Sequence, residues 1–305
     1  MMSYAAVAEP FRAANVLSER HLYEWRHIAR ARGAATASNG AELRADADVG
    51  DALDVDFLFV FAAGNPSRFD DPATLAWLRW LAAKGVRIGG ISGGPYVLAH
   101  AGLLDGYRCT IHWEHRPAFA EAFPMLRVQQ SLYVVDRERL TCAGGTAGLD
   151  LAIDLIAAEH GRPLADRVGE WYIRTQLRDA GADQRMSLRD RFGTANEKVL
   201  AALRLLETSP EDPPGRAELA QQVGVSIRQL ERLFACELGS SIATQARSLR
   251  LDRAMTMLRE TGLSVTEIAV ASGFVSPSHF SRSFRHRFGL APTAARRRHG
   301  PRFAP

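Results

Sequence analysis

The heptapeptide GGISGGP runs from Gly89 to Pro95, and its middle five residues fit the pattern G-x-S-x-G of a nucleophile elbow. An elbow requires a strand that ends at the serine and a helix that follows directly. The apolar run at residues 86–91 meets the first requirement, and the helical pattern after Pro95 meets the second. The sequence therefore predicts a strand–turn–helix unit with Ser92 in the turn, and it leaves open whether Ser92 reacts.

Short apolar runs alternate with helical patterns around this unit, from residue 20 to residue 160. Such alternation predicts a doubly wound parallel sheet, in which ligands bind beyond the carboxyl ends of the strands, where Gly64 and Ser92 would lie. The expected elements are strands over DFLFVFAAG (56–64), VRIGGI (86–91) and RCTIHW (108–113), a hairpin of QSLYVVD (130–136) and RLTCAGG (139–145), and helices from Pro72 and from Thr146.

Composition and charge divide the chain. Its 305 residues predict two domains. No run reaches the ~18 apolar residues of a membrane span, and no signal peptide is recognised, so a cytoplasmic protein is expected. The three cysteines, without a C-x-x-C pair, are expected to be buried free thiols.

Residues 196–305 hold 16 Lys and Arg against 10 Asp and Glu, a net charge of +6, whereas residues 1–195 have a net charge of −2. The C-terminal third is therefore the candidate for a polyanionic partner.

Two segments of this third share one pattern: AELAQQVGVSIRQLERLF (217–234) and VTEIAVASGFVSPSHFSRSFRHRFG (265–289). Each has a short helix with an alanine, then a glycine, then a helix opened by serine. Glycine permits a left-handed turn, alanine lets two helices approach, and serine caps the second helix, as in a helix-turn-helix. Two copies, offset by 50 residues from Ser226 to Ser276 and joined by a long amphipathic helix, favour DNA binding over an inert helical bundle.

The second helix of each copy carries groups able to reach bases and phosphates in a major groove. The candidates are Ser226, Arg228, Gln229 and Arg232 in the first copy, and Ser276, Ser278, His279, Ser281 and Arg282 in the second. SVTEIAVASGFVSPSHFSRSFRHRFGLAPT (264–293) resembles the signature of the AraC/XylS transcription regulators, and the resemblance covers Glu197 to Thr293. It implies that the long helix holds two recognition helices for successive major grooves on one face of the DNA.

The N-terminal region also resembles a family. GGISGGPYVLAHAGLLDGYRCTIHW (89–113) is similar to the elbow of PfpI-like, class I glutamine amidotransferase-like proteins, where the strand ends in a pattern like A-I-C-H-G-P. Ser92 stands where that family has its cysteine, and Gly93 where it has a histidine. A serine needs an adjacent base, so no catalytic residue is expected. The alternative is a PfpI-type hydrolase or amidase in which His112 or His115 activates Ser92.

The elbow still predicts a ligand pocket, with Asn65, Ser92, Gly93, His112, Trp113, Glu114 and His115 as candidates. Trp113 packed at the edge of a core and a solvated Glu114 are the plainer interpretations. If both line the pocket, they suit a small zwitterion, its carboxylate at the elbow amides and its cationic nitrogen at Trp113 and Glu114. The domain pairing resembles the GlxA-like AraC regulators, which implies an inactive amidotransferase-like domain and a nitrogenous inducer such as a quaternary amine or amino acid.

The beginning of the sequence departs from the resemblance. Met1 to Asn15 has the pattern of a helix with Val7, Phe11 and Ala14 on one face. The resemblance places a central strand before that helix, so the first strand is expected to be missing. A sheet without it should be unstable or rearranged, because neighbouring backbone groups would lack partners.

The sequence thus predicts a flavodoxin-like α/β domain that senses ligand (1–180), a linker (181–195) and an all-α, AraC-type DNA-binding domain with two helix-turn-helix motifs (196–305). The expected partners are double-stranded promoter DNA, a small polar effector, RNA polymerase and a second copy of the chain. No cofactor, metal or membrane contact is expected. The third alternative is a DNA-binding protein that senses no ligand.

Overall fold

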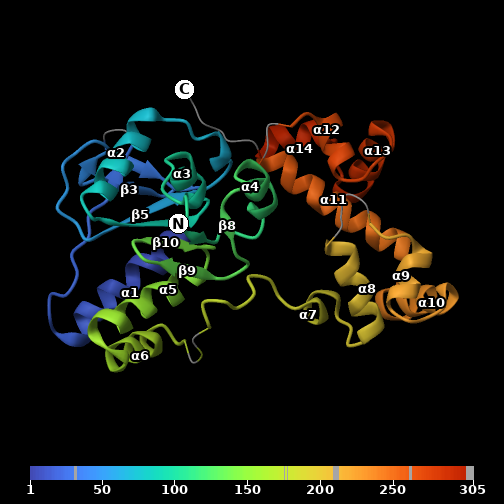
Figure 1. The fold of residues 1–305 in the computed structure, drawn as a ribbon, viewed down its shortest axis with the longest axis horizontal. Coiled ribbons are helices and arrows are strands. Elements are labelled where there is room, and N and C mark those ends of the chain that lie inside the picture. Colours follow the sequence, from blue (N-terminus) through green and yellow to red (C-terminus); the bar gives the residue numbers. More distant parts are fainter. Residues whose placement is uncertain (31–32, 175, 177, 209–212, 261–262, 300–305) are drawn as a thin grey trace. The chain divides into compact units, whose positions relative to one another are not determined.

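The computed structural model describes residues 1–30, 33–174, 176, 178–208, 213–260 and 263–299, so the last residues of the expected C-terminal domain, 300–305, lie outside the description. The chain divides into two compact units, Met1–Gln184 and Arg185–Pro305 (Figure 1). Each unit has hydrophobic cores of its own, as expected of separate domains.

A four-stranded sheet forms the centre of the first unit. Its order is β5 (Phe57–Ala62), β6 (Arg87–Ser92), β10 (Arg139–Cys142) and β9 (Tyr133–Asp136). The first three strands are parallel, and β9 pairs antiparallel with β10 as the predicted hairpin. The register pairs Ala62 with Ser92 and Ile91 with Cys142. The three parallel strands therefore end side by side, at the edge where ligand sites of such sheets form.

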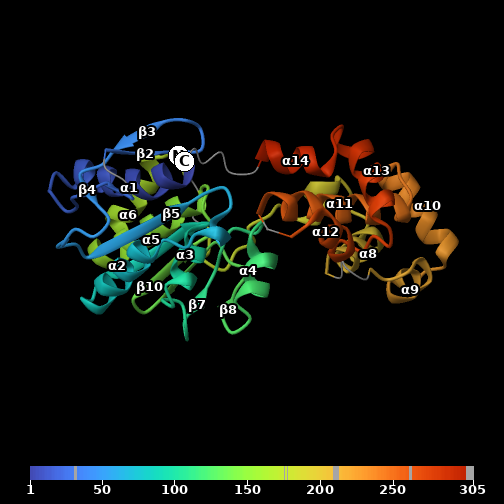
Figure 2. The same ribbon diagram turned by 90° about the horizontal axis from the view of Figure 1, so that it is seen from above.

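Helices cover both faces of this sheet (Figures 1 and 2). One face holds α2 (Pro72–Ala83) and α3 (Gly94–His100), and Ile88 of β6 joins their core. The other face holds α1 (Met2–Ser18) and α5 (Ala147–His160), where Ile91 of β6 packs, and α6 (Arg162–Trp171) packs on both helices. The predicted doubly wound fold is confirmed.

Shorter elements complete the unit: β1 (Ile28–Ala29) with β4 (Ala47–Asp48), β2 (Ala34–Thr36) with β3 (Glu42–Arg44), the 3-10 turn η1 (Pro66–Arg68), β7 (Arg108–Cys109) with β8 (Arg127–Val128), and α4 (Arg116–Ala122). The strand expected over residues 108–113 is therefore only two residues long. It ends because the Thr110 amide donates to the side-chain oxygen of Thr141 in β10, 2.9 Å away, instead of to a backbone carbonyl oxygen of that strand.

The helix predicted at the start of the sequence is α1, and it begins at Met2. Strand β5 is one of the two outer strands of the four-stranded sheet, and β9 is the other. The phenylalanines of β5 pack on α1 only in part, and Phe61 remains 38% exposed beside Tyr4. The expected instability of such a sheet stays a prediction.

Every regular element among the described residues of the second unit is a helix. The unit contains α7 (Leu188–Phe192), α8 (Glu197–Thr208), α9 (Arg216–Gln222), α10 (Ile227–Leu238), α11 (Ile242–Glu260), α12 (Val265–Ala271), α13 (Pro277–Phe288) and α14 (Pro292–His299). One core joins α8, α9 and α10, and another joins α12, α13 and α14. The 19-residue helix α11, about 28 Å long, contributes to both cores.

The cysteines differ in their surroundings. Cys109 and Cys142 are buried, and burial raises the pKa of the Cys109 thiol to about 11 and that of Cys142 to about 12. Cys236 is exposed on α10, so the expectation of three buried thiols is wrong for this residue. It lies on the other side of α10 from Leu230 and Phe234, the two buried residues of that helix.

Among the described residues, no helix combines the length and the apolar character that crossing a bilayer requires.

Candidate functional site

The elbow predicted at Ser92 is present in the backbone. Ser92 ends β6 with a φ of 61°, in the left-handed region that residues with a side chain seldom adopt, and α3 begins two residues later. Such a conformation persists only where the surrounding structure enforces it. The strand–turn–helix unit is therefore confirmed.

Gly93 has neither space for a side chain nor an available amide. A Cβ atom there would lie 2.8 Å from Cγ of Pro66 and 3.0 Å from the Ala62 carbonyl oxygen. The Gly93 amide donates to that same oxygen, 3.1 Å away. The position where the resemblance places a histidine is thus closed by Pro66, and one of the elbow amides expected to receive a carboxylate is already paired.

The loop that follows β7 lies against the elbow. The His112 amide donates to the Ser92 carbonyl oxygen over 3.4 Å, and the His115 amide donates to the His112 oxygen over 2.9 Å. The ring of Trp113 lies 5.5 Å from that of His112 and is 39% exposed, and Glu114 is half-buried. The structure therefore brings the backbone of His112 against the elbow and Trp113 against the His112 ring, and the role of His112, Trp113 and Glu114 as ligand contacts stays a prediction.

Two other predicted pocket residues are buried. His115 is 7% exposed, and its ring packs edge-on against Tyr96, 6.2 Å between centroids. Asn65 is also 7% exposed, and its side-chain oxygen accepts a hydrogen bond from Ser67. Both side chains contribute to local packing, and their role as ligand contacts stays a prediction.

The charge state of His112 affects what the elbow could bind. Burial, assisted by the nearby His115, lowers the pKa of His112, while Glu114 acts in the opposite direction. The imidazole is therefore neutral near pH 7. Within the described part of the chain, no side-chain hydrogen bond joins Ser92 to a histidine. A neutral ring, a carboxylate and an exposed indole face can together hold a cationic or hydrogen-bonding ligand.

Both helix-turn-helix motifs have the local structure predicted for them. Gly224 and Gly273 occupy the turns with φ of 70° and 73°. The Ser226 hydroxyl accepts a hydrogen bond from the Gln229 amide, and the Ser276 hydroxyl accepts one from the His279 amide. Since N-capping serines satisfy the unpaired amides of a first helical turn, Ser226 and Ser276 begin the recognition helices α10 and α13.

A positively charged side chain donates a hydrogen bond to the turn of each motif. Lys198 of α8 donates from Nζ to the Val223 carbonyl oxygen over 2.7 Å, and Arg250 of α11 donates to the Gly273 oxygen over 3.0 Å. Arg287 of α13 also forms a two-pronged ion pair with Asp252 of α11, 2.7 Å to each oxygen. Charged hydrogen bonds of this kind fix orientation, so the recognition helices are held in place against α8 and α11.

The outer faces of the recognition helices carry most of the predicted DNA-binding residues. Arg228, Gln229, Arg232, Ser278, His279 and Arg282 are exposed, whereas Ser281 is half-buried. Three exposed residues on the same faces were missed: Cys236 follows Arg232 by one helical turn, and Arg285 and His286 follow Arg282 by three and four residues. The i+3 and i+4 spacing from the predicted arginines was the signal that could have found them.

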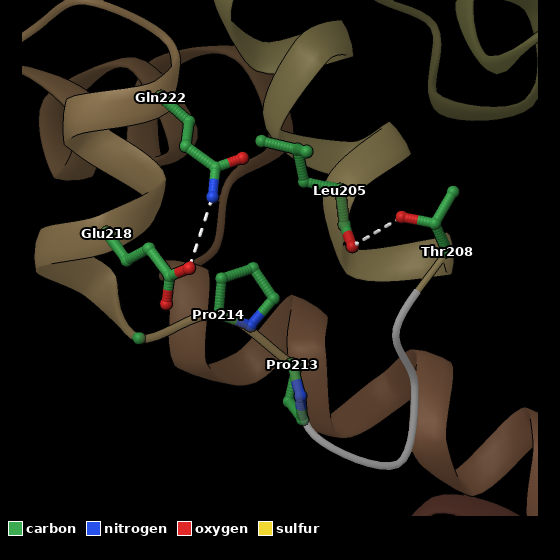
Figure 3. A pocket seen from close by; sticks show the side chains of 7 residues that line it. Leu205, Thr208, Pro213, Pro214, Glu218 and Gln222 are labelled. Carbon is green, nitrogen blue, oxygen red and sulfur yellow. Dashed lines mark hydrogen bonds between the residues drawn. The ribbon is translucent and has the colours of Figure 1, made fainter.

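A separate pocket of about 280 Å³ lies between the end of α8 and α9 in the second unit (Figure 3). It is lined by Leu205, Thr208, Pro213, Pro214, Gly215, Glu218 and Gln222. Its side chains are already engaged: Gln222 donates to Glu218 over 3.2 Å, and Thr208 donates to the Leu205 oxygen over 3.1 Å. None of the predicted site residues lines it, and we assign it no ligand.

Comparison with known proteins accounts for both units. Residues 4–158 match the DJ-1/PfpI family, and residues 219–298 match a helix-turn-helix domain. The chain is 42% identical to the HTH-type transcriptional regulator CdhR of Pseudomonas aeruginosa, over 97% of this chain and 88% of that one. It belongs to the HTH-type transcriptional regulators that join a DJ-1/PfpI domain to an AraC-type helix-turn-helix domain.

A second relative and a solved structure agree with this assignment. The HTH-type transcriptional regulator GlxA of Rhizobium meliloti is 42% identical over 98% of this chain and 93% of its own length. A crystal structure of an AraC family transcriptional regulator from Pseudomonas putida shares a TM-score of 0.51 and 27% identity, and covers 56% of this chain and 92% of that one. The protein is a DNA-binding transcriptional regulator, and its elbow lies within the DJ-1/PfpI domain.

Proposed function

We propose that the DJ-1/PfpI domain of this regulator is a catalytically inactive sensor that binds a small polar effector at the elbow. The observation that carries the proposal is the combination at Ser92. The elbow retains its strained backbone, with a φ of 61°, whereas Pro66 closes the space beside it in which a base at residue 93 would need to lie. A serine without a base is a poor nucleophile, but the same elbow still presents His112, Trp113 and Glu114.

The effector that fits these residues has a cationic nitrogen. The Trp113 face attracts a cation through its quadrupole, and the Glu114 carboxylate attracts the same charge. The lowered pKa of His112 keeps that ring from repelling the cation near pH 7. Because the Gly93 amide already donates to Ala62, the cationic end of a zwitterion is the end that the site recognises best.

DNA recognition is assigned to the exposed residues of α10 and α13. Arg228, Gln229 and Arg232 would lie in one major groove, and Ser278, His279 and Arg282 in the next, with α11 between them. Phosphate contacts should dominate the affinity and make it sensitive to salt. Effector changes DNA binding only if it has different affinities for two states of the chain. Participation of a second copy and of RNA polymerase follows from the family resemblance alone.

A thermal-shift screen of the purified chain tests the sensor. The panel holds quaternary amines, amino acids and neutral polar metabolites, and mass spectrometry follows each compound recovered. We expect cationic compounds to raise the melting temperature and to return unchanged. Glu114→Gln should weaken their binding about tenfold, because a charged contact contributes about 1.5 kcal/mol.

Trp80 provides the matched control, because it is 41% exposed on α2 and Trp113 is 39% exposed. Trp113→Ala should abolish most of the shift, and Trp80→Ala should leave it intact. A hit that keeps its full affinity in both Glu114→Gln and Trp113→Ala would place the effector elsewhere. A compound recovered chemically altered by the wild type, and unaltered by Ser92→Ala, would establish the hydrolase alternative.

A further inference from the structure

We propose that the carboxamide of Gln184 is a latch that couples the elbow to the segment leading into the DNA-binding domain. The inference rests on the proposed sensing function and names the residue through which effector binding would act. Gln184 is the last residue of the first unit, at the end of the connector formed by residues 172–184. We call its side chain, together with its acceptors on Thr110, Ile111 and Ser131, the Gln184 latch.

The connector is fastened to the first unit before it reaches the latch. Asp150 of α5 is buried and receives both Arg174 and Arg178, which lie 2.5 Å and 2.6 Å from its carboxylate oxygens. Further along, the Ala180 carbonyl oxygen accepts a hydrogen bond from the Leu132 amide over 2.8 Å. The two ion pairs of Asp150 and the backbone hydrogen bond to Ala180 therefore hold the connector against the first unit.

The Gln184 latch contacts residues 110 and 111, which directly precede His112. Nε2 of Gln184 lies 2.7 Å from the Ser131 carbonyl oxygen, 3.0 Å from the Ile111 oxygen and 3.1 Å from Oγ1 of Thr110. Ile111 precedes His112, whose amide donates to the Ser92 carbonyl oxygen. The path from Gln184 to Ser92 therefore consists of the hydrogen bond to Ile111, the peptide bond from Ile111 to His112, and the hydrogen bond from His112 to Ser92.

Among the described residues, the Gln184 carboxamide has acceptors for its nitrogen but no donor for its oxygen. A carboxamide has two N–H groups, so three acceptors must share them. Its oxygen, Oε1, is buried and accepts no hydrogen bond within the described structure. A buried acceptor without a donor costs free energy that water would recover on release. A ligand that shifts residues 112–114 can therefore break the hydrogen bonds of Gln184 at a small net cost in free energy.

The residue after the latch belongs to the second unit and is fixed there. Arg185 pairs with Glu207 at the end of α8, 3.5 Å away, and Arg191 pairs with the same carboxylate. Helix α8 carries Lys198, which holds the turn of the first helix-turn-helix motif. Two consecutive residues, Gln184 and Arg185, therefore make their side-chain contacts with different units.

Two substitutions and one control test the latch. Gln184→Met keeps the side-chain volume and removes the donors, and Gln184→Ala removes both. Gln176→Ala is the control, since Gln176 is an exposed glutamine of the same connector. Circular dichroism and the melting temperature verify folding of each full-length variant.

The first readout is amide hydrogen exchange without effector, over peptides covering residues 110–116 and 185–192. Both Gln184 variants should exchange about tenfold faster than wild type in both peptides, and Gln176→Ala should match wild type. Wild-type exchange at residues 110–116 in both Gln184 variants would overturn the proposal, because the latch would not reach the elbow.

The second readout is the change in DNA affinity caused by a compound that raised the melting temperature. In Gln184→Met that change should fall to nearly none, while the compound's own Kd stays within about twofold of wild type. An undiminished response in Gln184→Met would overturn the latch. A wild-type chain that binds none of the compounds would instead contradict the sensing function, and the exchange measurement would still decide the latch.

Discussion

Replacing Gly94 by alanine is expected to destabilise the N-terminal unit by about 3 kcal/mol, at the upper end of what overpacking costs. The added Cβ would lie 2.1 Å from the carbonyl oxygen of Val60, far closer than a non-bonded carbon and oxygen can approach. Neither side can move easily. Val60 is paired with Gly90 in the sheet, and Gly94 is the first residue of α3, which is buried from Gly94 to Ala99. The strand or the helix must shift.

Urea unfolding of the full chain, followed by tryptophan fluorescence, measures this effect, because all five tryptophans precede Gln184. Gly181→Ala is the matched control, since no atom lies within 4 Å of its added Cβ and its φ is not positive. That variant should remain within about 0.5 kcal/mol of wild type. Coinciding curves for Gly94→Ala and wild type would show that α3 does not approach β5 as closely as described.

Replacing Arg282 by alanine is expected to weaken DNA binding about tenfold to a hundredfold. A specific arginine contact to a base is worth about 1–3 kcal/mol, and each 1.4 kcal/mol is a factor of ten. Arg282 is exposed on α13, on the side opposite Phe280 and Phe284, which are buried. Its loss should therefore leave the core of the helix-turn-helix motif intact and remove only the DNA contact.

Fluorescence anisotropy with a duplex selected from random DNA by the wild-type chain measures the affinity. Arg204→Ala removes the same charge from an exposed position on α8, outside both recognition helices. This variant should lose only the DNA affinity that a single positive charge contributes at any exposed position. Equal affinities for the Arg282 and Arg204 variants would contradict the placement of α13 in a groove. Effector binding should be unchanged in both.

The sequence was sufficient where a feature depends on neighbouring residues. The strained turn at Ser92, the hairpin of β9 and β10, and the serine caps at Ser226 and Ser276 were all predicted, because each follows from local residue types. The buried alanines Ala220 and Ala269 likewise follow from the helical repeat. The division into an α/β part and a helical part required only the change in apolar periodicity.

Features that depend on residues distant in the sequence were not predictable. Nothing near Gly93 in the sequence shows that Pro66 fills the space beside it, or that Ala62 occupies its amide. The strand at Arg108 ends early because Thr141, 31 residues away, takes the Thr110 amide. The burial of His115 depends on packing against Tyr96. The connector has no periodic pattern that would place Gln184 against Ile111.

A ligand bound at the elbow is expected to control DNA binding by α10 and α13. The most direct measurement is a DNA titration of the full chain with and without a compound that raises its melting temperature, repeated with Trp113→Ala. We expect at least about a fivefold change in DNA affinity for wild type, the lower range of allosteric coupling, and none for Trp113→Ala. Equal DNA affinities with and without bound compound in wild type would contradict this expectation.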